Sequence, residues 1–137
     1  MSTQKDSIRR MFDEAINLGK LEVIDELFHP DFQTVTPQGS FDLQGFKDYV
    51  VAWRTGFPDV HCEVSDLIEE GDRIAWRVRA TGTHTGDFMG IPATGRSIDY
   101  DSLNIGTFKD GRAWRHQVVM EDAKMMTQLG LMPGPTG

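Results

Sequence analysis

The residue best suited to acid–base chemistry is His116, which lies in the alternating run from Ala113 to Glu121. An imidazole has an ordinary pKa of about 6.5, so it can accept or donate a proton near neutral pH. Alternate residues of a strand share one face, which groups His116 with Trp114, Val118 and Met120. We predict that His116 transfers protons; the alternative is a structural hydrogen bond within a sheet.

Two carboxylates, Glu121 and Asp122, follow this run directly. Asp122 has the same strand parity as Val118, so it is expected at the end of the face that carries His116. Glu121 has the opposite parity and points away unless a bulge redirects it. The competing interpretation for both is a solvated carboxylate near a helix N-terminus, where negative charge is favourable. Asp122 is therefore the carboxylate candidate for catalysis.

Metal and thiol chemistry have little support in the sequence. The histidines show no metal-ligand spacing, so no metal is predicted. The single cysteine, Cys62, excludes an intrachain disulfide and lies in an alternating run, as a small buried apolar residue would.

Size and composition narrow the class of protein. With 137 residues, the chain is expected to form one domain over residues 1–137. A hydrophobic content of 39% and a charged content of 26% are typical of a globular protein. The net charge of −7 and the absence of a basic cluster argue against a nucleic-acid partner. No signal peptide or long apolar stretch is present, so we expect a cytoplasmic protein without membrane contact.

The N-terminal half contains the helical patterns. An apolar stripe with helical spacing starts at Ile8 and ends at Ile16, and Gly19 is placed to stop that helix. A short helix is predicted over Leu21–Phe28, and a longer one over Leu43–Thr55 with Trp53 on its apolar side.

The C-terminal half contains strand patterns. Three long runs alternate, over Ile74–His84, Ile98–Phe108 and Ala113–Glu121, and a weaker run covers Val60–Ile68. Asp110-Gly111 joins the last two long runs and predicts a hairpin, because both residues tolerate positive φ. Arg77 and Arg79 are expected to pair with Asp99 or Asp101 across strands.

These patterns predict an α+β fold, in which helices cover one face of an amphipathic, mostly antiparallel sheet. Such a sheet, curved over N-terminal helices, encloses a central cavity that is the natural ligand site. A short strand over Phe32–Thr36 would add Thr34 to that cavity.

Several motifs resemble one known family. They are His29-Pro30-Asp31-Phe32, Phe57-Pro58-Asp59, Gln128-Leu129-Gly130 and the run TGTHTGDFMGIPATGR over Thr81–Arg96. The chain is similar, over nearly its whole length, to SnoaL-like polyketide cyclases of the nuclear transport factor 2-like superfamily, which also holds ketosteroid isomerase. The resemblance implies a cone-shaped α+β barrel around the cavity, no cofactor, and a homodimer or homotetramer formed through the sheet. It does not fix the reaction, because this superfamily supports many chemistries.

The chain departs from that family at two positions of the expected cavity wall. Relatives commonly read His-Trp-Asp where this chain has His116-Gln117-Val118, and the aspartate is their acid/base group. They also tend to carry a histidine where this chain has Asn104. Valine cannot transfer a proton, so the cyclase mechanism of such relatives cannot be copied unchanged.

The resemblance also suggests which residues meet a ligand. We predict that His116, Asn104 and Asp122 are catalytic, with Asn104 donating to an oxyanion. The alternative for Asn104 is a buried amide that satisfies its neighbours. The predicted substrate-binding residues are Thr34, Trp53, Phe57, Phe88, Met89, Tyr100, Ser102, Trp114, Val118 and Met120.

The predicted function is a cofactor-independent enzyme for a small hydrophobic, polyketide-like carbonyl compound. It would cyclise, isomerise or dehydrate that compound by acid–base chemistry in a closed cavity. The alternative is a non-catalytic binding protein for a hydrophobic small molecule, in which Val118 replaces the usual aspartate. A third possibility is an interaction module that uses the open face of the sheet.

Overall fold

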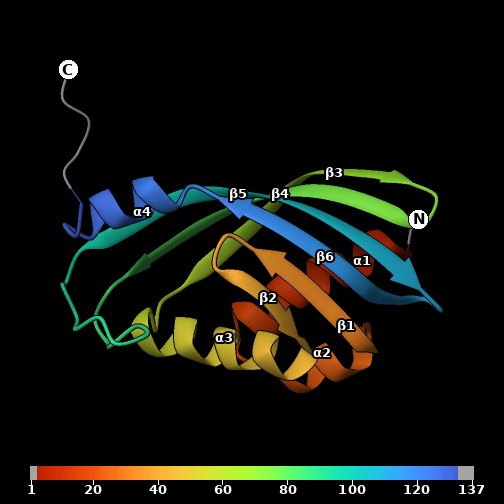
Figure 1. Cartoon of the computed structure of the whole chain (residues 1–137), viewed down its shortest axis with the longest axis horizontal. Helices are drawn as coiled ribbons and strands as arrows, with labels where there is room; N and C mark the ends of the chain where they lie inside the picture. Colours follow the sequence, from red (N-terminus) through yellow and green to blue (C-terminus); the bar gives the residue numbers. More distant parts are fainter. Residues whose placement is uncertain (1–2, 133–137) are drawn as a thin grey trace.

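The computed structural model describes residues 3–132 and has a mixed α+β architecture (Figure 1). Its elements are α1 Thr3–Arg10, the π-helical η1 Met11–Ile16, α2 Glu22–Leu27, β1 Phe28–Thr36, β2 Gly39–Asp42, α3 Leu43–Gly56, β3 His61–Glu70, β4 Arg73–Thr83, β5 Ser97–Lys109, β6 Arg112–Met120 and α4 Asp122–Gln128. The predicted α+β class is confirmed. No helix within residues 3–132 is long and apolar enough to cross a membrane.

The strands form one six-stranded sheet in the order β2-β1-β6-β5-β4-β3. Neighbouring strands are antiparallel except β1 and β6, which are parallel. The sheet curves over α1, α2 and α3, and α4 continues from the end of β6 (Figure 1). The predicted meander corresponds to β3, β4, β5 and β6. The sheet is open rather than closed, because β2 and β3 remain edge strands.

The N-terminal stripe forms the helical side of the core. Ile8, Met11, Phe12, Ala15 and Ile16 are all buried, as the helical spacing predicts. The chain leaves this segment through Gly19, whose φ of +75° suits a residue without a Cβ atom. On α3, the Asp42 side chain caps the first turn by accepting a hydrogen bond from the Gly45 N–H at 2.8 Å.

The hairpin prediction between β5 and β6 is confirmed, since Asp110 and Gly111 have φ values of +53° and +77°. Two features of the first strand region differ from the prediction. β1 begins at Phe28 and includes His29-Pro30, because its parallel pairing with β6 already starts at Phe28. The short strand β2 pairs back onto β1, and it was not predicted because four residues are too few to show an alternating pattern.

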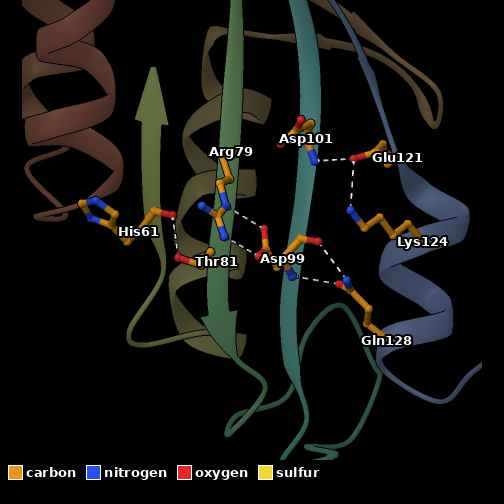
Figure 2. Close-up of polar contacts among 8 residues, drawn as sticks. All are labelled: His61, Arg79, Thr81, Asp99, Asp101, Glu121, Lys124 and Gln128. Carbon is orange, nitrogen blue, oxygen red and sulfur yellow. Dashed lines mark hydrogen bonds and ion pairs between the residues drawn. The ribbon is translucent and has the colours of Figure 1, made fainter. Parts of the chain in front are cut away.

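The outer face of the sheet carries the predicted charge pairs. The Arg79 guanidinium binds the Asp99 carboxylate at 2.6 Å and 2.9 Å (Figure 2). Arg77 Nη1 lies 3.9 Å from Oδ2 of Asp101. All four side chains are about half-exposed to solvent, so these pairs select strand register more than they stabilise the fold. The opposite face of β4 buries Trp76, as the alternation predicts.

Candidate functional site

A cavity of about 60 Å³ lies between the helices and the inner face of the sheet. A buried water molecule needs about 15 Å³ of such space, so this cavity holds about four of them. A drug-sized ligand needs a far larger volume. The wall is mainly aromatic and aliphatic with a few polar groups. Its lining residues are Phe12, Phe46, Tyr49, Trp53, Val78, Ala80, Tyr100, Ser102, Asn104, His116, Val118 and Met120.

A chain of four polar side chains crosses the inner face of the sheet. The Thr34 hydroxyl on β1 donates to Nδ1 of His116 on β6 at 2.7 Å. Nε2–H of His116 donates to Oδ1 of Asn104 on β5 at 2.8 Å. The Asn104 amide donates in turn to the Ser102 hydroxyl at 3.1 Å. The register of the strands brings these side chains together. Parallel pairing of β1 with β6 places Thr34 opposite His116. Antiparallel pairing of β5 with β6 places Asn104 opposite Val118, two residues along β6 from His116.

His116 is held as a neutral imidazole. Its ring stacks on Trp76, with ring centroids 5.5 Å apart and planes at 16°, and on Phe32 at 6.4 Å. Burial lowers the pKa of His116 from 6.5 to about 4, because a charged imidazolium would lose its hydration here. His116 therefore does not titrate near neutral pH, as an unperturbed histidine would. Both ring nitrogens are already engaged, so His116 can orient Asn104 but has no free lone pair for a ligand.

Asp122 is the carboxylate near the tyrosine end of the cavity. It is half-buried, and burial raises the pKa of its carboxyl above the ordinary value although Gln38 donates a long 3.5 Å hydrogen bond to it. Its negative charge also contributes to the raised pKa values of Tyr49 and Tyr100, both of which line the cavity. A carboxylate in this setting is easier to protonate than one in water, as acid–base catalysis requires.

The helix that carries Asp122 is tied to the sheet by contacts to the backbone of β5 (Figure 2). The Gln128 side-chain amide both donates to the carbonyl and accepts from the N–H of Asp99, each at 2.8 Å. Glu121 makes the same kind of pair with Asp101, accepting at Oε1 at 2.7 Å and donating from its backbone N–H at 3.0 Å. These groups continue the sheet pairing where β6 has ended, and they fix where α4 begins.

Most of the sequence-predicted residues meet at the cavity. Trp53, Tyr100, Ser102, Val118 and Met120 line it together with His116 and Asn104. Thr34 lies one layer behind, with 2% of its surface exposed, and reaches the site through His116.

Three predicted binding residues lie elsewhere, in and beside the loop that follows β4. Phe57 and Phe88 are buried and pack on each other with ring centroids 5.4 Å apart, and Phe57 stacks on His84 at 5.0 Å. Met89 is 62% exposed. This loop packs so tightly on the end of α3 that a Cβ atom at Gly86 would clash with the Thr55 carbonyl oxygen. The glycine-rich motif thus shapes a packed corner of the fold.

Trp114 does not face the cavity. A bulge between β5 and β6 pairs Thr107 with Arg115 but Phe108 with Ala113, so the inward parity that His116 follows is lost at Trp114. Its indole ring instead makes cation–π contacts, with Arg115 Cζ at 4.0 Å and Lys109 Nζ at 4.9 Å from the ring centroid.

Five cavity residues escaped the sequence-based prediction: Phe12, Phe46, Tyr49, Val78 and Ala80. Their apolar periodicity identified most of them as core residues. A core position and a cavity-lining position give the same signal in a sequence, because both face inward. Tyr49 carried a weak additional signal, since a tyrosine beside an apolar helix stripe places a hydroxyl near the interior.

Comparison with known proteins identifies the family of the chain. The family model of the SnoaL-like polyketide cyclases matches residues 6–129. The chain belongs to this family. It is 30% identical over 141 residues to the aklanonic acid methyl ester cyclase DnrD of Streptomyces peucetius, covering 99% of this chain and 96% of the relative. It is 28% identical to the aklanonic acid methyl ester cyclase AcmA of Streptomyces galilaeus, covering 85% and 83%.

Solved structures agree on the fold. The crystal structure of wild-type IdmH from Streptomyces antibioticus superposes with a TM-score of 0.81 at 32% identity, covering 92% of this chain and 97% of IdmH. TsrD from Streptomyces laurentii gives a TM-score of 0.86 at 25% identity, covering 95% and 96%.

Proposed function

We propose that the chain is a cofactor-independent enzyme that closes a ring in a small hydrophobic, polyketide-like carbonyl compound. Membership in the family and the names of the curated relatives support the substrate class. The observation that carries the proposal is the position of Asp122: a half-buried carboxylate with a raised pKa, beside an aromatic cavity whose own polar groups are uncharged.

Asp122 is the proton acceptor in this proposal. Its carboxylate removes a proton from the carbon next to a substrate carbonyl, which leaves an enolate. The enolate carbon then bonds to a second carbonyl carbon of the same molecule, and the resulting alkoxide takes the proton back from Asp122. The product is an isomer of the substrate, so no oxidant, reductant or cofactor is consumed.

His116 and Asn104 position groups rather than exchange protons. His116 holds Oδ1 of Asn104, and the Asn104 amide uses one hydrogen on Ser102. The second amide hydrogen remains for an oxyanion at the cavity wall. His116 is therefore a positioning residue, and Asn104 is the group that meets the substrate.

A substrate larger than the cavity must widen it. Two features support such a movement: no side chain of α4 is fully buried, and Met120, an unbranched and adaptable side chain, forms part of the wall. Displacement of α4 would open the same end of the cavity at which Asp122 lies.

The test is turnover of aklanonic acid methyl ester, followed by chromatographic separation of the ring-closed isomer. Asp122→Asn is expected to lower the rate at least about 100-fold, the usual contribution of a general base. Asp48→Asn, at an exposed carboxylate of α3, is the matched control and should leave the rate unchanged. Equal rates for wild type and Asp122→Asn would disprove the assignment of Asp122.

A second candidate function, non-catalytic binding of a hydrophobic small molecule, is favoured by two observations. Val118 occupies the position of the usual aspartate, and both nitrogens of His116 are already bonded within the protein. A binding protein would hold aklanonic acid methyl ester without converting it, and Asp122→Asn would not weaken that binding.

We also propose that two copies of the chain associate through the outer face of the sheet. Leu103 and Val119 are direct cross-strand neighbours there and are 58% and 61% exposed. Arg77 and Asp101 flank them with opposite charges, which suits a self-complementary contact.

A further inference from the structure

The two tyrosines of the chain, Tyr49 and Tyr100, line the same cavity from opposite walls. Tyr49 projects from α3 on the helical side, and Tyr100 projects from β5 on the sheet side, where it is 3% exposed. Within residues 3–132 neither hydroxyl makes a hydrogen bond to the protein. In that range, the polar side-chain atoms that are fully enclosed and have no hydrogen-bond partner are Trp76 Nε1 and His84 Nε2. The tyrosine oxygens are not among them, so both remain accessible.

An unpaired phenol hydroxyl at a cavity needs an explanation, because tyrosines that are buried normally bond at their polar end. Packing alone does not supply one, since phenylalanine would fill the same volume without a hydroxyl. The chain uses phenylalanine for this purpose at Phe12 and Phe46 of the same wall. The hydroxyls are therefore positioned for a polar atom that enters with a ligand.

The chemistry of these hydroxyls identifies the kind of atom. Burial raises the pKa of Tyr49 to about 12 and holds that of Tyr100 well above its ordinary value. Both phenols therefore stay protonated at neutral pH and act as hydrogen-bond donors. His116 donates to Asn104, and Asn104 donates one amide hydrogen to Ser102, so the second Asn104 hydrogen is a further donor at the same wall. Because both phenols donate, the ligand atom that they bind is an acceptor, such as a carbonyl or enolate oxygen.

We propose that Tyr49 and Tyr100 form the oxygen-binding site of the cavity, each donating its hydroxyl to a carbonyl or enolate oxygen of the ligand. This inference deepens the proposed function and rests on it for the identity of the substrate. In that reaction, the tyrosines hold the carbonyl whose neighbouring carbon loses a proton to Asp122. Donation strengthens as negative charge develops on the oxygen, so it favours the enolate over the ketone.

The direct test uses acetophenone, whose carbonyl oxygen can only accept, and ethylbenzene, which has a similar shape without that oxygen. Because the chain contains two tyrosines, labelling with 13Cζ-tyrosine gives two NMR signals that both report on the cavity. Acetophenone is expected to shift both signals, and ethylbenzene to leave the hydroxyl-sensitive shifts nearly unchanged.

Binding of the same two probes to Tyr49→Phe and Tyr100→Phe separates hydrogen bonding from packing. Each substitution is expected to weaken acetophenone binding about 3- to 10-fold, the loss of one neutral hydrogen bond, and to leave ethylbenzene affinity within about twofold. The proposal is wrong if wild type does not prefer acetophenone to ethylbenzene, or if both Phe variants bind acetophenone as wild type does.

Turnover of aklanonic acid methyl ester distinguishes failure of this inference from failure of the proposed function. Full activity in both Phe variants would overturn the tyrosine site and leave the cyclase proposal intact. Tyrosine-dependent acetophenone binding in a wild-type protein that converts no ester would overturn the cyclase and retain the oxygen-binding site.

Discussion

The Nε2 atom of His116 lies 2.8 Å from Oδ1 of Asn104, an atom that can only accept a hydrogen bond. The proton of the neutral imidazole is therefore on Nε2, and Nδ1 is left to accept from Thr34. We expect 15N NMR to give a pyrrole-type shift for Nε2 and a pyridine-type shift for Nδ1, unchanged from pH 8 to pH 5. Averaged shifts, or protonation near pH 6.5, would contradict the arrangement.

Protein stability should fall in acid because of His116. Its pKa is about 4 when folded and 6.5 when unfolded, so the unfolded chain binds more protons between these values. The contribution is complete above pH 6.5 and decreases as the pH falls toward 4. The expected loss in the free energy of unfolding is roughly 3 kcal/mol by pH 4.

Urea unfolding of wild type and His116→Gln over this pH range measures that loss. Glutamine does not titrate, and the other ionisable groups are common to both proteins. The difference between the two plots of unfolding free energy against pH therefore isolates the contribution of His116. Parallel plots would exclude the proposed pKa.

Introducing an aspartate at position 118 tests whether the wall there tolerates a carboxyl group. Val118 is 9% exposed and pairs across strands with Asn104. Val118→Asp buries a carboxyl in a largely apolar wall, and we expect a loss of about 2–4 kcal/mol of stability at pH 7. Thermal unfolding should show that loss diminishing at pH 5, because a buried carboxyl is more readily protonated. The Val118→Thr variant, which has nearly the same volume and buries a neutral hydroxyl, is the control for burial of a polar group without charge.

Association through the sheet predicts a specific effect at its outer face. Leu103→Lys places a charge on the exposed apolar pair formed with Val119, and we expect it to convert a dimer to a monomer. Light scattering coupled to size exclusion reports the mass directly. Val51→Lys, at an exposed apolar position on α3, is the matched control and should leave the mass unchanged. A monomeric wild type would disprove the contact.

The sequence by itself determined the elements and their inward faces. The apolar stripe from Ile8 to Ile16 forms the first helical segment, and Asp110-Gly111 forms the hairpin, because helical spacing and turn chemistry are local properties. The face shared by His116, Val118 and Met120 also follows from strand alternation alone. The family resemblance supplied the register that adds Tyr100, Ser102 and Asn104 on β5.

Tertiary structure decided everything that depends on how distant segments meet. The bulge beside Thr107 turns Trp114 outward, and the parallel pairing of β1 with β6 brings Thr34 to His116. The lowered pKa of His116 follows from that enclosure, not from the identity of the residue. Tyr49, which a sequence records only as one side chain of a helix, meets Tyr100 across the cavity because the sheet curves over α3. Local pattern fixes which way a side chain points, whereas register, curvature and burial fix what it finds there.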